Sequence, residues 1–187
     1  MITEGPITVL IVDDDTEVCN TYEMYFRGER FRTRVAQGGP EALLKVDDDV
    51  DIVLLDRRMP EVSGDEVLEF IRDWNLDCRV IMVTAVNPDT SIIEMEFDGY
   101  LTKPVSKSEL LSTVKQQVLF ERYQTLFERY QTATRKHALL AAQDVDDEEL
   151  RELTERRETL KQRLENTVDA FDNEMVKETL ADLHQSS

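Results

Sequence analysis

The sequence predicts an α/β domain built on a doubly wound, five-stranded parallel sheet, followed by an all-α extension that forms a helical hairpin or a coiled coil. Two observations carry this prediction. Short apolar runs alternate with amphipathic stretches up to residue 118, which is the pattern of repeated βα units. Beyond residue 119, the sequence contains no strand-like run, no glycine and no proline, and its pattern predicts helix. We therefore expect two domains, residues 1–118 and 119–187.

Five apolar runs in the first domain are the predicted strands. The first is almost continuously apolar from Val9 to Val12, which is typical of a central strand buried on both faces. The second alternates apolar and polar residues, as a half-exposed edge strand does. The predicted strands are Ile7–Val12, Phe31–Ala36, Ile52–Leu55, Val80–Thr84 and Gly99–Leu101.

Helix-like patterns separate these runs. Ser106 and Glu109 have the spacing of a capping box, which predicts that the last helix of the domain begins there. The predicted helices cover residues 16–27, 39–47, 64–74, 89–97 and 106 onward.

The last of these helices continues past residue 118 without a stop signal. The heptapeptide Leu-Phe-Glu-Arg-Tyr-Gln-Thr at 119–125 is repeated at 126–132. A seven-residue repeat keeps apolar residues on one face, because seven residues are almost two helical turns. Apolar residues and one histidine recur at alternating spacings of four and three: Leu119, Tyr123, Leu126, Tyr130, Ala133, His137 and Leu140.

A second long helix follows, with Asp146 as its predicted N-cap and Glu149 three residues later. It carries an apolar stripe formed by Leu150, Leu153, Leu160, Leu164, Val168, Phe171, Met175, Leu180 and Leu183. The two stripes must be buried, either against each other in a hairpin, which we favour, or in a homodimer through the 106–142 helix.

The chain is strongly acidic, with a formal net charge of −18 and a pI near 4.4. A surface of this charge repels phosphate backbones, and no basic stripe is present, which argues against direct binding to nucleic acid. Its 15 arginines outnumber its 7 lysines. Carboxylate-rich, lysine-poor surfaces are suited to concentrated salt, so we favour a halophilic source over an ordinary acidic cytosolic protein.

Other features predict a cytoplasmic protein. No apolar run exceeds five residues, at 138–142, far short of the roughly 20 that span a bilayer. The N-terminus has neither the positive charge nor the apolar stretch of a secretory signal. Cys19 and Cys78 lack metal-ligand spacing, and buried free thiols in a reducing compartment are the expected state.

Polar residues follow the predicted strands directly. In an open parallel sheet, ligands bind outside the carboxyl ends of the strands, so these side chains should converge. Clustered carboxylates need a cation, and an all-oxygen ligand set suits Mg²⁺. A carboxylate at the centre can attack phosphorus, while a hydroxyl and an ammonium contact the phosphoryl oxygens. The residues are Asp13, Asp14, Asp15, Asp56, Thr84 and Lys103.

Each of these residues also has a structural interpretation. The three aspartates at 13–15 are good helix caps, and Asp15 is assigned that role rather than a place in the site. Thr84 is a common β-branched strand residue, and Tyr100 fits a core position. Arg57 and Arg58 are interpreted as solvated surface residues unless they act beside Asp56.

Four segments together resemble the response regulator receiver domain. They are Ile11–Asp15, Leu54–Pro60 with Gly64, Val83–Ala85 and Tyr100–Pro104, and they occur in the order and at the spacings of that family. The resemblance covers residues 7 to 118. It implies a flavodoxin-like sheet with strand order 2-1-3-4-5, and a signalling switch that transfers a phosphoryl group to itself and loses it again, rather than an ordinary enzyme.

The resemblance also implies a role for each metal-site residue. Asp56 is similar to the phosphoacceptor, and Asp14 to the direct Mg²⁺ ligand. Asp13 would act through a water molecule. The backbone carbonyl of Arg58, together with Asp56, would complete the Mg²⁺ site.

Further positions resemble the switch residues of the family. Thr84 and Lys103 are similar to the switch hydroxyl and the phosphate-binding lysine, and Tyr100 to the aromatic switch. Lys103–Pro104 resembles the family's cis peptide bond. The small side chain of Ala85 would leave access to the phosphoryl group.

The second domain resembles the HalX helical domain that follows receivers in halophilic archaea, notably in Glu-Arg-Tyr and in the stretch 136–140. His137 is interpreted there as a packing residue. The expected partners are a sensor histidine kinase and an unknown output protein. Two alternatives remain open at this point: a transcription regulator that contacts DNA directly or through a partner, and a phosphatase of the haloacid-dehalogenase type.

Overall fold

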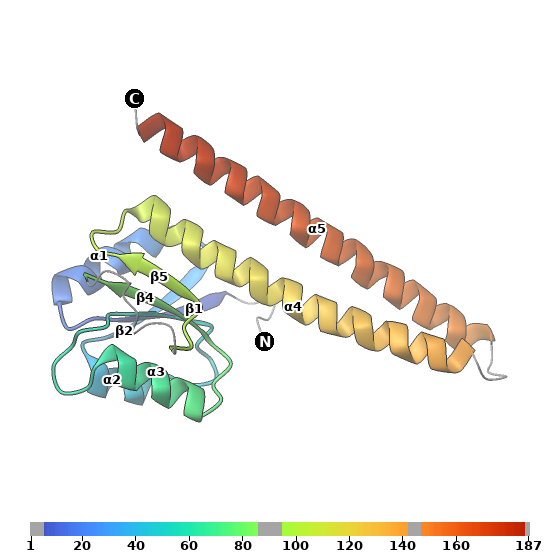
Figure 1. Cartoon of the computed structure of the whole chain (residues 1–187), viewed down its shortest axis with the longest axis horizontal. Helices are drawn as coiled ribbons and strands as arrows, with labels where there is room; N and C mark the ends of the chain where they lie inside the picture. Colours follow the sequence, from blue (N-terminus) through green and yellow to red (C-terminus); the bar gives the residue numbers. More distant parts are fainter. Residues whose placement is uncertain (1–5, 86–94, 142–146, 186–187) are drawn as a thin grey trace. The chain divides into compact units, whose positions relative to one another are not determined.

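The computed structural model describes residues 6–85, 95–141 and 147–185. Two compact units make up the chain, Met1–Gln117 and Val118–Ser187. The first contains a parallel sheet with helices on both faces, and the residues of the second that the structure describes are all helical (Figure 1). The predicted fold class is confirmed.

The sheet has five parallel strands in the order β2-β1-β3-β4-β5, as the receiver resemblance implies. Every residue of β1 is buried, whereas β2 at the sheet edge is mostly half-buried. The central and edge strands are therefore those that the apolar patterns predict. The strands are β1 (Ile7–Val12), β2 (Phe31–Ala36), β3 (Ile52–Leu55), β4 (Arg79–Thr84) and β5 (Gly99–Thr102).

Five helices lie within the described residues. Three begin at the predicted residue, α1 at Thr16, α2 at Gly39 and α3 at Gly64, and α4 begins one residue after its predicted start. Figure 1 shows α1 and the first turns of α4 on one face of the sheet, and α2 with α3 on the other. The helices are α1 (Thr16–Phe26), α2 (Gly39–Lys45), α3 (Gly64–Asp73), α4 (Lys107–Ala141) and α5 (Asp147–Gln185).

One predicted helix is not part of this set. The stretch 89–97 falls mostly on residues 86–94, which lie outside the described residues. Its last three residues, Met95–Phe97, are described and are not helical. Met95 and Phe97 instead pack against the core, so their apolar character reflects burial rather than a helical stripe.

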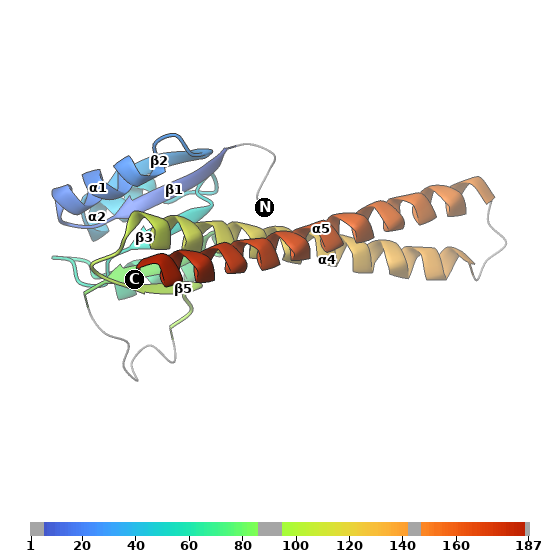
Figure 2. The same ribbon diagram turned by 90° about the horizontal axis from the view of Figure 1, so that it is seen from above.

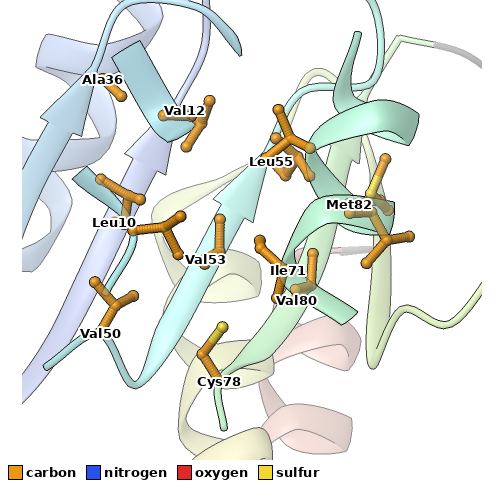
Figure 3. Packing of buried hydrophobic residues seen from close by; sticks show 14 of the residues in the cluster. Leu10, Val12, Ala36, Val50, Val53, Leu55, Ile71, Cys78, Val80 and Met82 are labelled. Carbon is orange, nitrogen blue, oxygen red and sulfur yellow. The ribbon is translucent and has the colours of Figure 1, made fainter. Parts of the chain in front are cut away.

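A layer of apolar side chains fills the space between the sheet and α2 and α3 (Figure 3). Alternate residues of the central strands point into it, because side chains of a strand alternate between the two faces. Leu10, Val53 and Ile71 are completely buried there. This core fixes the strands in register and so fixes where their carboxyl ends lie.

In the second unit, α4 and α5 form an antiparallel hairpin (Figures 1 and 2). Each residue of the predicted α4 seam is buried or half-buried, with Ala133 buried. On α5, Leu160 is buried, and the Nε2 atom of His137 lies 3.0 Å from the Thr154 hydroxyl oxygen. Of the two predicted arrangements, the structure has the intramolecular hairpin.

The helix ends show which capping predictions hold. The Ser106 hydroxyl accepts a hydrogen bond from the Glu109 N–H at 3.2 Å, one of the two bonds of the predicted capping box. The Asp15 carboxylate caps α1 by accepting from the Glu17 N–H at 2.8 Å. The predicted N-cap of α5, Asp146, lies outside the described residues.

Candidate functional site

Three charged side chains from different strand ends meet at one point. Asp13 follows β1, Asp56 follows β3 and Lys103 follows β5. The Lys103 Nζ atom lies 2.5 Å from Asp13 Oδ2 and 2.8 Å from Asp56 Oδ1. Asp13 is only 3% exposed and Asp56 6%. The structure therefore brings together two buried carboxylates and one ammonium that are far apart in sequence.

The remaining oxygens of these carboxylates accept backbone hydrogen bonds. The Asp15 N–H donates to Asp13 Oδ1 at 3.0 Å, and the Arg58 N–H donates to Asp56 Oδ2 at 2.7 Å. Each carboxylate thus holds one bond to the lysine and one to the loop that follows its own strand. Such bonds orient both groups before any ligand arrives.

Burial and charge shift the titration of this cluster. Desolvation raises the pKa of the Asp13 carboxyl, and the negative charge of Asp56 adds to that, although hydrogen bonds from Lys103 and Asp15 oppose it. For Lys103, burial lowers the pKa, but the hydrogen bonds to Asp13 and Asp56 outweigh it and the net pKa is raised. Lys103 is therefore an ammonium at neutral pH.

The two predicted switch residues lie on the neighbouring strands β4 and β5. Thr84 ends β4 and is 1% exposed, and its carbonyl accepts a hydrogen bond from the Lys103 N–H at 2.9 Å. Tyr100 on β5 is half-buried, with its ring centroid 5.6 Å from that of Phe97. The peptide bond between Lys103 and Pro104 is cis, as the resemblance implies.

Asp14 occupies a different position from Asp13. Its side chain is exposed and lines an open pocket together with Arg58, Met59 and Pro60. Arg58 is also exposed, whereas the next residue, Met59, is only 9% exposed and holds this loop against the domain. The structure thus places Asp14 and Arg58 at the rim of the site and Asp13 and Asp56 at its base.

The sequence analysis missed one charged pair at this rim. Arg57 was interpreted as a solvated residue, but its side chain is only 13% exposed. Its guanidinium holds the Asp65 carboxylate through both oxygens, with Nε 3.0 Å from Oδ1 and one terminal nitrogen 3.2 Å from Oδ2. A spacing of eight residues across a turn gives no periodic signal, so only the fold shows this pair.

A second missed feature is the capping box of α3. The Ser63 hydroxyl accepts from the Glu66 N–H at 3.3 Å, and the Glu66 carboxylate accepts from the Ser63 N–H at 2.8 Å. The Ser-x-x-Glu spacing that identifies this motif is present in the sequence. These bonds lower the pKa of Glu66.

The donor chemistry of the site fits a hard divalent cation. Asp13, Asp14 and Asp56 offer carboxylate oxygens at adjacent strand ends, which Mg²⁺ prefers over nitrogen or sulfur ligands. Within the part of the chain that the structure describes, no three acidic, histidine or cysteine side chains are already arranged around a common metal position. The Lys103 ammonium, which bridges two of the carboxylates, supplies the neutralising charge in this arrangement.

Comparison with known proteins gives the family. Residues 9–115 match the model of the response regulator receiver domain, which is more than half of the chain. The chain therefore belongs to the receiver domain family and carries the receiver domain of a two-component response regulator. This match decides against the haloacid-dehalogenase alternative. No helix among the described residues is long and apolar enough to cross a membrane.

Three similar proteins illustrate the relationship. A putative transcriptional regulator of Haloferax volcanii is 51% identical over 77% of this chain, and response regulator SaeR of Staphylococcus epidermidis is 35% identical over 55%. The chain spans 24% of the first relative's length and 46% of the second's. A CheX–CheY–BeF3–Mg²⁺ complex from Borrelia burgdorferi matches with a TM-score of 0.56, at 28% identity, covering 60% of this chain and 89% of that one.

Proposed function

We propose that the chain is a phosphorylation-dependent switch in which a sensor histidine kinase transfers a phosphoryl group to Asp56 in the presence of Mg²⁺. The observation that carries the proposal is the setting of the Asp56 carboxylate. It is buried at a strand end, between the Lys103 ammonium at 2.8 Å and the Arg58 N–H at 2.7 Å. Both donors are suited to stabilising a phosphorylated carboxylate.

In the proposed transfer, an oxygen of the Asp56 carboxylate forms a bond to phosphorus while the bond between phosphorus and the donor histidine nitrogen breaks. The electron pair of that bond stays on the histidine. Lys103 would contact the phosphoryl oxygens, and a bound Mg²⁺ would supply positive charge that offsets charge on those oxygens. Later hydrolysis by water returns Asp56 to the carboxylate.

The metal-binding roles are assigned to residues at the ends of β1 and β3. Asp14, whose side chain is exposed beside the pocket, would bind Mg²⁺ directly. Asp13 would act through water, and Asp56 and the Arg58 carbonyl would complete the set. A metal bound there would compete with Lys103 for the carboxylate oxygens that the lysine holds in this structure. The Mg²⁺ in the similar Borrelia burgdorferi complex supports this proposal.

Thr84 and Tyr100 are proposed to transmit the change. The phosphoryl group adds about 1.5 to 2 negative charges at neutral pH, which attracts a hydroxyl and an ammonium placed nearby. Thr84 is next to Lys103 in the sheet, because the Thr84 carbonyl accepts a hydrogen bond from the Lys103 N–H. Movement of Thr84 would leave space for the half-buried Tyr100 ring to turn inward.

The output is proposed to be a protein–protein interaction made by the helical domain at 119–187. The receiver domain at 1–118 ends within α4, and α4 continues from Lys107 to Ala141 as one helix. This helix is therefore a candidate for transmitting the change from the receiver domain to the helical domain. Homodimerisation through this helix, as a coiled coil, is one form that the output could take.

We also propose that the helical domain is HalX-like; the similarity to the Haloferax volcanii relative is not confined to the receiver domain. That alignment covers 144 residues, more than the receiver match, so it extends into the second unit. We also propose a halophilic, cytoplasmic setting, in which the charge of −18 would be screened by salt. We expect the free energy of unfolding to increase with KCl concentration.

A second candidate function is transcription regulation, because the same relative is described as a putative transcriptional regulator. With a net charge of −18, contact with DNA through a partner is favoured over direct contact. A mobility shift of duplex DNA by the protein alone, lost as salt is raised, would support direct contact instead.

Intact mass spectrometry after incubation with acetyl phosphate and Mg²⁺ tests the phosphorylation. The native chain should gain one phosphoryl group and the Asp56→Asn variant none. Asp15→Asn is a matched control, because Asp15 belongs to the same aspartate cluster but serves as a helix cap. An adduct that persists in Asp56→Asn, or is lost in Asp15→Asn alone, would contradict the assignment.

Amide hydrogen exchange of the full chain tests the output. Phosphorylation should change protection along residues 107–141, with the unphosphorylated Asp56→Asn variant as the control. A response confined to residues before 107 would contradict the role of α4.

A further inference from the structure

The loop between β3 and α3 is closed at its base by the Arg57–Asp65 ion pair. Arg57 is the second residue after β3, and Asp65 is the second residue of α3. The guanidinium Nε lies 3.0 and 3.3 Å from the two Asp65 oxygens, and a terminal nitrogen lies 3.2 Å from Oδ2. A planar guanidinium that meets both oxygens fixes direction as well as distance, which a lysine cannot do.

Backbone contacts hold the same two chain segments together. The Gly64 N–H donates to the Arg57 carbonyl at 3.0 Å. A Cβ atom at Gly64 would lie 2.2 Å from the Asp56 carbonyl oxygen, so the start of α3 lies directly against the backbone of the phosphoacceptor. The ion pair thus ties α3 to the strand end at the point where the site begins.

The loop that these contacts close carries the Arg58 peptide. Its N–H donates to Asp56 Oδ2 at 2.7 Å, and its carbonyl is the backbone ligand assigned to Mg²⁺. Arg58 itself has an exposed side chain, so its own packing does little to fix its backbone. Its hydrogen bond to Asp56, the neighbouring ion pair and the buried Met59 are among the contacts that can do so.

We propose that the Arg57–Asp65 ion pair positions the Arg58 peptide and thereby sets the Mg²⁺ affinity of the site. Arg57 and Asp65 are positioning residues, since neither is assigned a contact with the metal or the phosphoryl group. The proposal rests on the proposed Mg²⁺-dependent function.

A purely electrostatic effect of the same pair predicts a different outcome. Removing the Arg57 charge would leave the Asp65 carboxylate unpaired near the site and attract the cation more strongly. Removing the Asp65 charge would take that negative charge away from the guanidinium, which would then repel the cation more strongly. The two single variants would then change the Mg²⁺ affinity in opposite directions, whereas a positioning role weakens binding in both.

Isothermal titration calorimetry of the full chain with MgCl₂ separates these cases. We expect Arg57→Met and Asp65→Ala each to weaken Mg²⁺ binding about tenfold, the range found when groups that orient metal ligands are removed. The double variant should be no weaker than either single one, since both remove the same contact. Arg57→Lys keeps the positive charge but loses the contact with both Asp65 oxygens. This variant should also bind Mg²⁺ more weakly than the native chain.

Metal-free protein gives an independent readout. Exchange of the Arg58 amide, followed by NMR, should be faster in Arg57→Met and in Asp65→Ala than in the native chain. Asp47→Ala is the matched control, because it breaks the Arg34–Asp47 ion pair on the same domain, 2.8 Å long and partly exposed, away from the site. The control should change neither the Mg²⁺ affinity nor the exchange of the Arg58 amide.

Three results would overturn the positioning role: opposite shifts in the two single variants, native affinity in Arg57→Lys with weakened binding in Arg57→Met, or an unchanged Arg58 amide. Failure of the proposed function is distinguishable, because the native chain itself would then neither bind Mg²⁺ nor gain a phosphoryl group.

Discussion

The two compact units of this chain are stabilised in different ways. In the first, the largest fully buried side chains come mainly from three strands and two helices, and they include Leu10, Ile71 and Leu110. In the second, among the described residues only Val118, Ala133 and Leu160 are buried. A sheet covered on both faces buries side chains on all sides, whereas two helices bury only one stripe each.

This difference explains where a site can form. Asp13, Asp56 and Lys103 are separated by 43 to 90 residues in sequence, and the sheet brings them within hydrogen-bonding distance. A polar contact between the helices of the second unit, His137 to Thr154, joins residues only 17 apart in sequence. Chemistry that needs several buried charges at one point therefore belongs to the first unit.

The largest expected effect comes from a cavity in the sheet core. Leu10→Ala should lower the free energy of unfolding of the first unit by about 3 to 5 kcal/mol, because Leu10 is fully buried. Leu160→Ala should cost about 2 kcal/mol and act on the hairpin. Urea unfolding followed by the fluorescence of Trp74, the only tryptophan, reports the first unit. An equal shift of that transition in both variants would contradict the comparison.

A smaller loss is expected at the glycine beneath the site. Gly64→Ala should cost about 3 kcal/mol, because the new Cβ would lie 2.2 Å from the Asp56 carbonyl oxygen and force the backbones apart. Gly28→Ala is the control: it has no atom within 4 Å but a φ of +85°, so about 1 kcal/mol of backbone strain is expected. Thermal unfolding measures both, and equal losses would exclude the close approach as the cause.

The buried charges of the first unit predict a pH dependence. Burial lowers the pKa of Lys103, but its hydrogen bonds to Asp13 and Asp56 raise it above the ordinary 10.5 overall. With the folded-state pKa raised, the stabilisation is complete below 10.5 and is lost as the pH rises through the folded value. Lys103→Met should therefore show a flatter decline of stability at alkaline pH than the native chain, as measured by urea unfolding at successive pH values.

Ionisation of three other buried groups also lowers stability at alkaline pH and must be separated from that of Lys103. Burial raises the pKa of the Cys19 and Cys78 thiols to about 11. Burial raises the pKa of the Tyr22 phenol to about 12, so its ionisation also destabilises the fold at high pH. The informative quantity is the difference between the native chain and Lys103→Met. Parallel curves would show that the lysine carries no part of the alkaline loss.

The smallest effect is expected at the hairpin. Thr154→Val removes the hydroxyl that lies 3.0 Å from His137 Nε2 and that also donates to the Leu150 carbonyl; loss of the contact with His137 should cost about 1 kcal/mol. Far-UV circular dichroism would detect the loss, while the fluorescence of Trp74 should not change. Thr159→Val is the control on the exposed face of α5. A shift in Trp74 fluorescence would show that the two units are energetically coupled.

Local patterns predicted most elements of the fold. The β1 and β3 strands have the bounds that their apolar runs predict, and the seven-residue repeat in α4 keeps its seam buried or half-buried. The stretch ending at Met95–Phe97 failed as a helix within its described residues, because apolar residues that pack on a core from a loop have no required period.

The candidate site likewise contains residues that the sequence predicts and contacts that it does not. Asp13, Asp56 and Lys103 were predicted from their places after strands, since parallel strands end at one edge of a sheet. The Arg57–Asp65 pair was not predicted, because a spacing of eight residues does not indicate that a loop brings the two side chains together. Asp13 and Asp14 are neighbours with the same side chain, yet one is buried and the other exposed.

The sequence by itself determined the order of elements, the central and edge strands, the helical character of the second unit and the residues that end each strand. These follow from local periodicity and from the short range of capping and strand propensity. Tertiary structure alone decided that Lys103 bridges two buried carboxylates, that Arg57 holds Asp65 and that α4 and α5 pair within one chain. Those outcomes depend on distances between segments remote in sequence, which only packing of the whole fold sets.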